Sequence, residues 1–107
     1  MIDDRKYLTL LSLNLRNFRP WRILDQDQNS NYTQEIKERY PNRKLIPFAV
    51  RVDCDDIACW DLSKESQKIY IIHDFASEGW EEQAVFENFE AWMESVLRDM
   101  YEFNEAI

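Results

Sequence analysis

The stretch from residue 45 to residue 75 constrains the fold most strongly, because its apolar residues alternate with a period of two. Successive side chains of a β-strand point to opposite faces of a sheet, so this period is typical of strands. Short polar segments interrupt the stretch twice, and Asp is tolerated in such turns because its side chain bonds to the nearby backbone. We therefore predict an antiparallel meander of three strands, over residues 45–52, 57–62 and 68–75.

The alternation also assigns the residues of each predicted strand to two faces. In the first strand, one face carries Ile46, Phe48, Val50 and Val52, and the other carries Leu45, Pro47, Ala49 and Arg51. In the second strand, one face carries Ala58, Trp60 and Leu62, and the other carries Ile57, Cys59 and Asp61. The turn between these two strands is acidic and consists of Asp53, Cys54, Asp55 and Asp56.

The segment after Asn88 has the period of a helix. Its apolar residues follow the spacing of a stripe that faces a core, and they are Phe89, Trp92, Met93, Val96, Leu97 and Met100. Asn88 is placed to cap the N-terminus of this helix. We predict a long amphipathic C-terminal helix that packs on the sheet. Residues 81–87 fit a helical segment or a different structure, and their pattern leaves both open.

The N-terminal part has weaker patterns. Residues 4–18 fit both a helix and a strand, and we predict a helix over about residues 4–14. A short strand is expected at residues 21–24.

A second helix is predicted from an N-cap at Asn31 to Tyr40. Gln34 stands three residues after Asn31, in the register of a capping box. Pro41 cannot continue the helical hydrogen bonds, so the helix is expected to end at Tyr40.

Together these elements predict a single α+β domain over residues 1–107, an antiparallel sheet flanked by helices. No segment approaches the ~18 consecutive apolar residues that a membrane span needs. The N-terminus lacks the basic start and the cleavage site of a secretory signal, so we expect a cytoplasmic protein with no membrane partner. These patterns leave the oligomeric state open.

The two cysteines are expected to be free thiols. Cys54 and Cys59 are five positions apart, which puts their side chains on opposite faces of an extended chain. Two cysteines without a second pair or a histidine cluster do not form a zinc site. The chain has a single glycine, Gly79, and therefore no glycine-rich loop for a phosphate group. We expect no cofactor and no metal.

Charge is distributed unevenly along the chain. Residues 1–44 hold nine Lys/Arg and six Asp/Glu, a net charge of +3, whereas residues 45–107 hold four and fifteen, a net charge of −11. An acidic surface repels phosphate backbones, so we expect no nucleic-acid partner for this part of the chain. Complementary fields favour a basic protein partner instead. The alternative is a solvated acidic surface that serves only solubility.

A partner-binding set follows from the acidic residues and one tryptophan. Trp80 stands beside Gly79 in an expected loop, where an exposed aromatic side chain could anchor a partner or, alternatively, fold over the edge of the core. The acidic turn lacks the glycine and the terminal Glu of a calcium-binding loop. The candidate residues are Asp53, Asp55, Asp56, Asp61, Glu78, Trp80, Glu81 and Glu82.

The single histidine, His73, does not suggest an enzyme. A general base needs an oriented partner and a nucleophile or water within reach. His73 and Asp74 are neighbours on a predicted strand, so their side chains point to opposite faces and cannot form a dyad. Neither cysteine lies in a recognisable nucleophile motif. We expect a partly buried strand histidine and no catalytic residues.

Three phrases, in order, resemble a known family. They are Leu45-Ile46-Pro47-Phe48-Ala49 with Asp55-Asp56-Ile57-Ala58-Cys59-Trp60-Asp61-Leu62, then Ile69-Tyr70-Ile71-Ile72-His73, and then Asn88-Phe89-Glu90-Ala91-Trp92-Met93. This order resembles the SUKH superfamily, which contains yeast cell-wall synthesis regulators of the Smi/Knr type and many bacterial immunity proteins. The resemblance is strongest over residues 41–104. Typical members carry a longer leading helix pair and an Asn-Gly turn before the sheet, which this chain lacks.

The resemblance implies an α+β fold with an antiparallel sheet flanked by helices. For bacterial members it implies a cytoplasmic immunity protein that binds and blocks a cognate toxin. A basic toxin, such as a nuclease, would fit the acidic part of this chain. The yeast members imply a second possibility, a protein-interaction module of a regulatory protein. The resemblance implies no catalytic residues, because none are known to be shared by the family.

Overall fold

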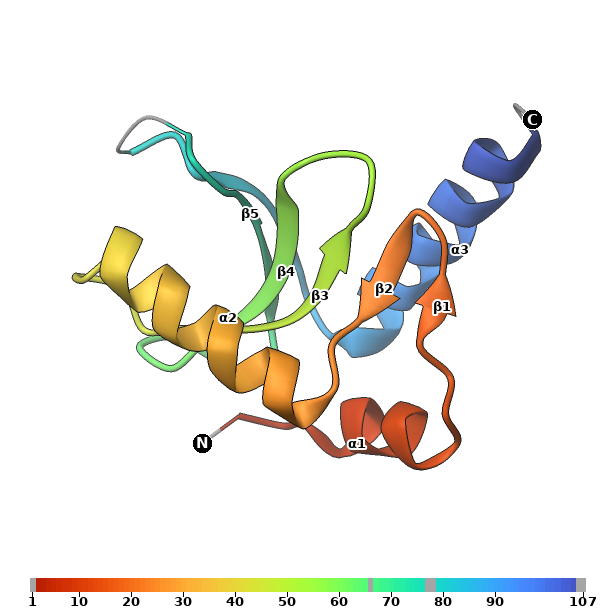
Figure 1. Cartoon of the computed structure of the whole chain (residues 1–107), viewed down its shortest axis with the longest axis horizontal. Coiled ribbons are helices and arrows are strands. Elements are labelled where there is room, and N and C mark those ends of the chain that lie inside the picture. The colour runs from red at the N-terminus through yellow and green to blue at the C-terminus, as the bar shows by residue number, and fades with distance from the viewer. Residues whose placement is uncertain (1, 66, 77–78, 106–107) are drawn as a thin grey trace.

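A computed structural model describes residues 2–65, 67–76 and 79–105. Within these residues the chain forms one six-stranded antiparallel sheet and three helices, which confirms the predicted α+β class (Figure 1). The strands are β1 Asn17–Phe18, β2 Trp21–Ile23, β3 Leu45–Arg51, β4 Asp56–Asp61, β5 Ile69–His73 and β6 Glu82–Phe86. The helices are α1 Arg5–Ser12, α2 Gln26–Arg39 and α3 Phe89–Glu105. None of these helices is both long and apolar enough to cross a membrane.

The sheet is a meander, because each strand pairs with the next one along the chain. The predicted strands correspond to β2, β3, β4 and β5. The sequence pattern did not predict β1, which has only two residues. It also left residues 81–87 open, and the structure shows that β6 is a strand at the edge of the sheet.

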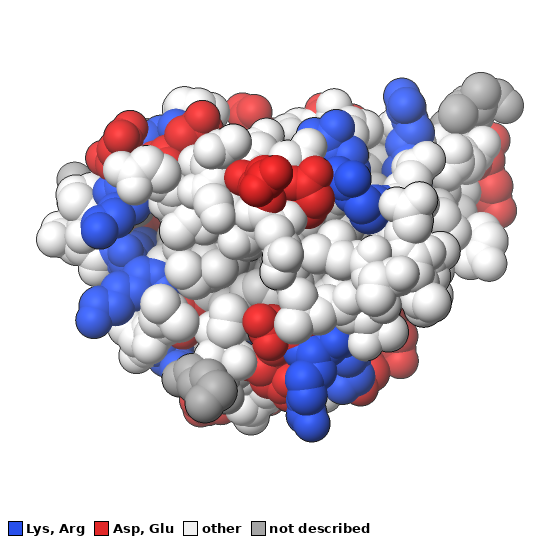
Figure 2. Space-filling view, turned by 60° about the horizontal axis from the view of Figure 1, so that its bottom comes forward, with Lys and Arg blue, Asp and Glu red and all other residues white. Residues whose placement is uncertain are grey.

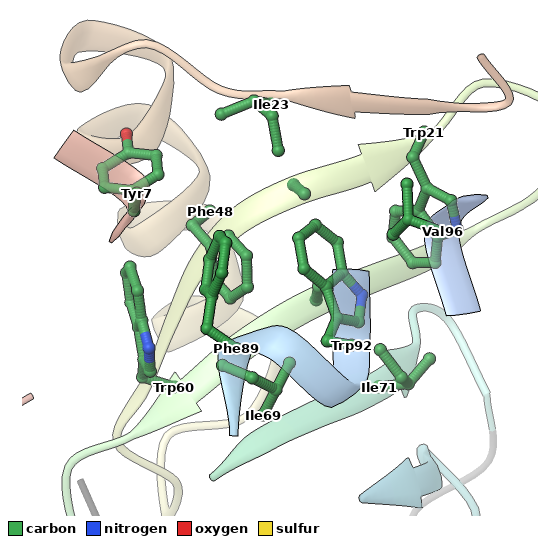
Figure 3. Packing of buried hydrophobic residues seen from close by; sticks show 12 residues of the cluster. Tyr7, Trp21, Ile23, Phe48, Trp60, Ile69, Ile71, Phe89, Trp92 and Val96 are labelled. Carbon is green, nitrogen blue, oxygen red and sulfur yellow. The ribbon is translucent and has the colours of Figure 1, made fainter. Parts of the chain in front are cut away.

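One face of the sheet packs against α1 and α3 around Phe48 (Figure 3). The Phe48 ring stacks on Trp60 with a centroid distance of 4.3 Å and meets Trp92 edge-on at 4.9 Å. Trp92 from α3 is fully buried, and Tyr7 from α1 packs against both Phe48 and Trp60. The predicted packing of the C-terminal helix on the sheet is therefore confirmed.

The opposite face of the sheet packs against α2. Ile36 of α2 belongs to a second cluster of buried apolar residues. The partly buried side chains of Tyr32 and Tyr40 pack against this cluster. The sheet residues of this cluster include Leu45 and Val50 from β3, with further residues at Ile57, Cys59, Tyr70 and Ile72. The sheet thus separates two apolar cores.

One predicted face assignment is wrong because of a β-bulge. The pairing of β3 with β4 shifts between Pro47 and Ala49. Phe48 and Ala49 consequently both face the α1–α3 core, and Val50, predicted to lie beside Phe48, faces α2 instead. In β4 the prediction holds: Ala58 and Trp60 share one face, and Ile57 and Cys59 share the other.

The predicted start of the second helix is also wrong. Helix α2 begins at Gln26, and Asp25 is its N-cap. The Asp25 Oδ1 atom accepts a hydrogen bond from the Gln28 N–H at 2.8 Å, and the Gln28 Oε1 atom accepts one from the Asp25 N–H at 3.0 Å. Asn31 therefore lies inside the helix. The predicted end is confirmed, because Tyr40 is the C-cap residue and Pro41 follows it.

The C-terminal helix has the predicted N-cap, but fewer of its apolar residues are buried than the sequence pattern predicts. The Asn88 Oδ1 atom accepts a hydrogen bond from the Ala91 N–H at 2.8 Å, as expected of an N-cap. Phe89, Trp92 and Val96 are buried. Leu97, predicted to face the core, is 40% exposed.

Candidate functional site

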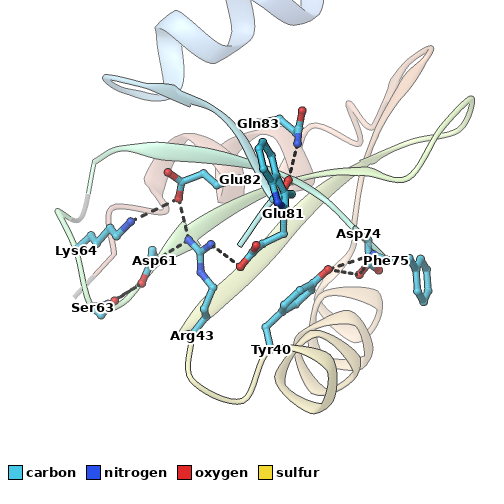
Figure 4. Close-up of polar contacts among 11 residues, drawn as sticks. Tyr40, Arg43, Asp61, Ser63, Lys64, Asp74, Phe75, Glu81, Glu82 and Gln83 are labelled. Atoms are coloured by element: carbon cyan, nitrogen blue, oxygen red, sulfur yellow. Dashed lines mark hydrogen bonds and ion pairs between the residues drawn. The ribbon is translucent and has the colours of Figure 1, made fainter. Parts of the chain in front are cut away.

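Seven of the eight predicted partner-binding residues are described by the structure, and they lie in two places. Asp53 and Asp55 lie in the acidic connection between β3 and β4, and Asp56, predicted to belong to the same turn, is the first residue of β4. Asp61, Glu81 and Glu82 surround Arg43, a residue that the sequence pattern did not single out (Figure 4). Trp80 precedes this second group and is 74% exposed. Glu78 lies outside the described residues.

The acidic turn is partly neutralised by its neighbours. Arg51 binds Asp53 through two N–H donors at 2.8 and 2.9 Å. These hydrogen bonds hold the pKa of Asp53 below its ordinary value. Asp55 is exposed and makes no ion pair with any other residue that the structure describes. Of the carboxylates of this turn, that of Asp55 is therefore the most accessible to a partner.

His73 pairs with the acidic turn across the sheet. Asp56 of β4 stands opposite His73 of β5, and the His73 Nδ1 atom lies 2.7 Å from the Asp56 Oδ1 atom. The hydrogen bond with Asp56 raises the pKa of His73 above its ordinary value of 6.5. His73 and Asp74 do not contact each other as a dyad: Asp74 is buried and binds Arg39 of α2.

The second group is a partly buried ion-pair cluster centred on Arg43. The Arg43 guanidinium lies 2.8 Å from Glu82, 3.4 Å from Glu81 and 3.5 Å from Asp61. Asp61 and Glu81 are buried, whereas Glu82 is exposed. Of this cluster, Glu82 and the neighbouring Trp80 are therefore the side chains that a partner could reach.

Burial alone would raise the pKa of Asp61. Hydrogen bonds from the N–H and O–H groups of Ser63, at 2.9 and 2.6 Å, and the charge of Arg43 hold that pKa below its ordinary value instead. Ser63 thus holds one carboxylate oxygen of Asp61, and the other oxygen lies 3.5 Å from the Arg43 guanidinium.

A groove of about 370 Å³ runs between α2, the acidic turn and the residues that follow β5. Its walls include Tyr32, Glu35, Arg39, Asp55, Asp56 and Phe75. Phe75 is 70% exposed and was not predicted as a site residue. The sequence pattern placed Phe75 at the end of the strand predicted over residues 68–75, whereas β5 ends at His73 and Phe75 follows it.

Charges of both signs occur on the surface seen from the side of α1. Figure 2 shows small clusters of acidic and basic side chains interspersed around a broad uncharged area. The acidity of the C-terminal part of the sequence therefore does not produce a continuous negative field on this face.

The described residues offer no grouping of three or more His, Cys, Asp or Glu side chains that could hold a metal ion. Cys54 is exposed and Cys59 is buried, and both are free thiols. Burial raises the pKa of the Cys59 thiol far above its ordinary value, so this cysteine is unreactive.

Comparison with known proteins identifies the family. Residues 3–95 match the model of the SMI1/KNR4 family (SUKH-1), a match that extends N-terminal to the resemblance over residues 41–104. Neither the curated proteins nor the solved structures contain a significant match to the chain. A match over most of the chain shows its membership, so this protein belongs to the SMI1/KNR4 family (SUKH-1).

Proposed function

We propose that this chain is a cytoplasmic immunity protein that binds a cognate bacterial toxin and neutralises it by occlusion, without catalysis. The observation that carries the proposal is membership of the SMI1/KNR4 family (SUKH-1), since the superfamily includes many bacterial immunity proteins. Occlusion needs a stable binding surface and no reactive centre. The candidate residues would supply such a surface here, because their side chains are ion-paired or exposed and are positioned by the sheet.

The charge of the chain supports a basic toxin as the partner. The net charge is −8, and Asp55 and Glu82 present carboxylates at the surface. A nuclease must attract phosphate groups and therefore presents Lys and Arg around its active site. An acidic protein that covers this region would block the substrate and gain a fast association rate from the opposite charges.

The proposed contacts differ among the candidate residues. Asp53, Asp55, Asp56, Glu82 and Trp80 would contact the toxin through exposed or half-buried side chains. The candidates Asp61 and Glu81 are buried around Arg43 and would act by holding that cluster in place. Glu78 remains part of the proposed set.

The second candidate function is a protein-interaction module in a regulatory protein, as in the Smi/Knr-type members. The mixed charges of the face in Figure 2 favour this possibility, because they do not require a strongly basic partner. Gene order separates the two functions, since an immunity gene should lie directly downstream of a toxin gene.

The decisive experiment is co-expression with the product of the adjacent gene, scored by rescue of growth and by a purified complex. The triple variant Asp53→Lys/Asp55→Lys/Asp56→Lys should weaken this complex and reduce its salt dependence. Glu94→Lys/Glu102→Lys/Glu105→Lys, on exposed positions of α3, makes the same change in net charge and should leave the complex intact. Equal behaviour of the two triple variants would contradict an electrostatic interface at the acidic turn.

A further inference from the structure

Phe75 has an unfavourable backbone conformation and an exposed side chain. Its φ angle is +63°, in the left-handed region that large L-residues rarely adopt, and its side chain is 70% exposed. A strained aromatic residue inside a core can be explained by packing. An exposed one gains little from burial, so the cost of its conformation needs a different explanation.

A hydrogen-bonded network holds Phe75 in this conformation. Its N–H donates to the Tyr40 hydroxyl at 3.1 Å and to the Asp74 Oδ1 atom at 3.0 Å. Arg39 binds the Asp74 carboxylate, and its guanidinium carbon lies 4.5 Å from the centroid of the Phe75 ring. Arg39 of α2 and Tyr40, the C-cap of that helix, therefore fix the position of this ring. Figure 4 shows Tyr40 and Asp74 beside Phe75.

The same network ties Phe75 to the acidic turn. The Asp74 N–H donates to the Asp55 carbonyl oxygen at 2.9 Å. The Asp55 side chain is exposed, and together with Phe75 and Glu35 it lines the groove beside α2. An exposed aromatic ring thus stands beside carboxylates on a scaffold that loses little entropy when a partner binds.

We infer that Phe75 is a pre-organised anchor for the toxin, and that it inserts into an apolar pocket whose rim carries Lys or Arg side chains for Asp55 and Glu35. This inference rests on the proposed function. The groove carries both signs, because Arg22, Arg39 and Arg51 line it together with Glu35, Asp55, Asp56 and Asp74. Arg39 and Arg51 are paired with Asp74 and Asp53, whereas Asp55 makes no ion pair with any other residue that the structure describes. The net charge of −8 therefore favours an occupant with a basic rim. Aromatic residues in such positions dominate the binding energy of many interfaces.

The test uses Phe75→Asn and the purified product of the adjacent gene. Asn tolerates a positive φ, so this variant removes the ring and relieves the strain together. We expect a higher midpoint of denaturation than in the wild type and a Kd for the toxin that is about 30-fold or more weaker, as for a hot-spot residue. Phe75→Tyr keeps the ring and should bind within a few-fold of the wild type.

Tyr101→Asn is the matched control, because Tyr101 is an aromatic residue that is 63% exposed. It belongs to α3, the helix that packs on the face of the sheet opposite to α2. Its Kd should equal that of the wild type.

Unchanged toxin binding by Phe75→Asn would overturn the inference and leave the proposed function intact. A Phe75→Asn variant that is less stable than the wild type would also overturn it, since the ring would then serve packing. Absence of any complex with the wild type would overturn the proposed function and this inference with it.

Discussion

Arg39 binds the carboxylate of Asp74 through two N–H donors, at 2.9 and 2.5 Å. The Asp74 side chain is only 5% exposed, so the pair lies largely out of water. The hydrogen bond with Asp74 raises the pKa of Arg39 above its ordinary value. Because Arg39 ends α2 and Asp74 follows β5, this pair joins the helix to the sheet near the groove.

The first prediction concerns the loss of this pair. Arg39→Ala leaves the Asp74 carboxylate buried without its cation, and an uncompensated buried charge is costly. Arg39 is partly exposed, so we expect a loss of roughly 2–4 kcal/mol in the free energy of unfolding. Urea denaturation at neutral pH measures it. Lys37→Ala, an exposed position in the same turn of α2, should change the stability by less than about 0.5 kcal/mol. Equal losses in the two variants would contradict the structural role of the pair.

The second prediction separates two possible starts of α2. Asp25→Ala removes an acceptor for the Gln28 N–H and should cost about 1 kcal/mol of stability. Asn31→Ala replaces an exposed residue inside the helix and should change the stability by less than about 0.5 kcal/mol. Thermal denaturation of both variants is the measurement. A larger loss for Asn31→Ala would restore the start that the sequence suggested.

Local sequence rules could not choose between these two starts. Asp25 with Gln28 and Asn31 with Gln34 both have capping-box spacing. Tertiary contacts decide between them, because the Asn29 side chain in the first turn donates to the Pro47 carbonyl oxygen of β3. The helix therefore begins early enough to reach the sheet. Tertiary pairing also explains why strand periodicity gave the wrong face for Ala49 and Val50. The pairing of β3 with β4 contains a bulge at Phe48, and a bulge changes the face of the residues that follow it.

The candidate site was predictable only in part. Acidic residues identified the turn at Asp53–Asp56, since a turn is a local feature of the sequence. The Arg43 cluster is not local: its members come from the loop before β3, the end of β4 and the start of β6. Phe75 was missed because its importance depends on a backbone angle and on Arg39, which lies 36 positions earlier in the sequence.

The third prediction concerns the α1–α3 core. Trp92 is fully buried, and its ring meets Trp21, Phe48 and Phe89 edge-on. Trp92→Ala should lower the free energy of unfolding by about 3–5 kcal/mol, through lost burial and the cavity left behind. Leu97→Ala on the same helix removes a side chain that is 40% exposed and should cost about 1 kcal/mol or less. An unchanged denaturation midpoint for Trp92→Ala would contradict the packing of α3 on the sheet.

The fourth prediction concerns the pH dependence that His73 gives to the fold. Asp56 favours the protonated imidazole in the folded state and so raises its pKa above 6.5. The stabilising contribution of a group with a raised pKa is complete below its ordinary pKa and is lost as the pH rises through the folded-state value. The stability difference between the wild type and His73→Gln should therefore be largest at mildly acidic pH and shrink as the solution becomes alkaline.

Because His73 is the only histidine of the chain, its NMR signal reports the titration directly. Asp56→Asn should return the midpoint toward 6.5, and an identical midpoint in the two proteins would show that the contact with Asp56 does not control this group.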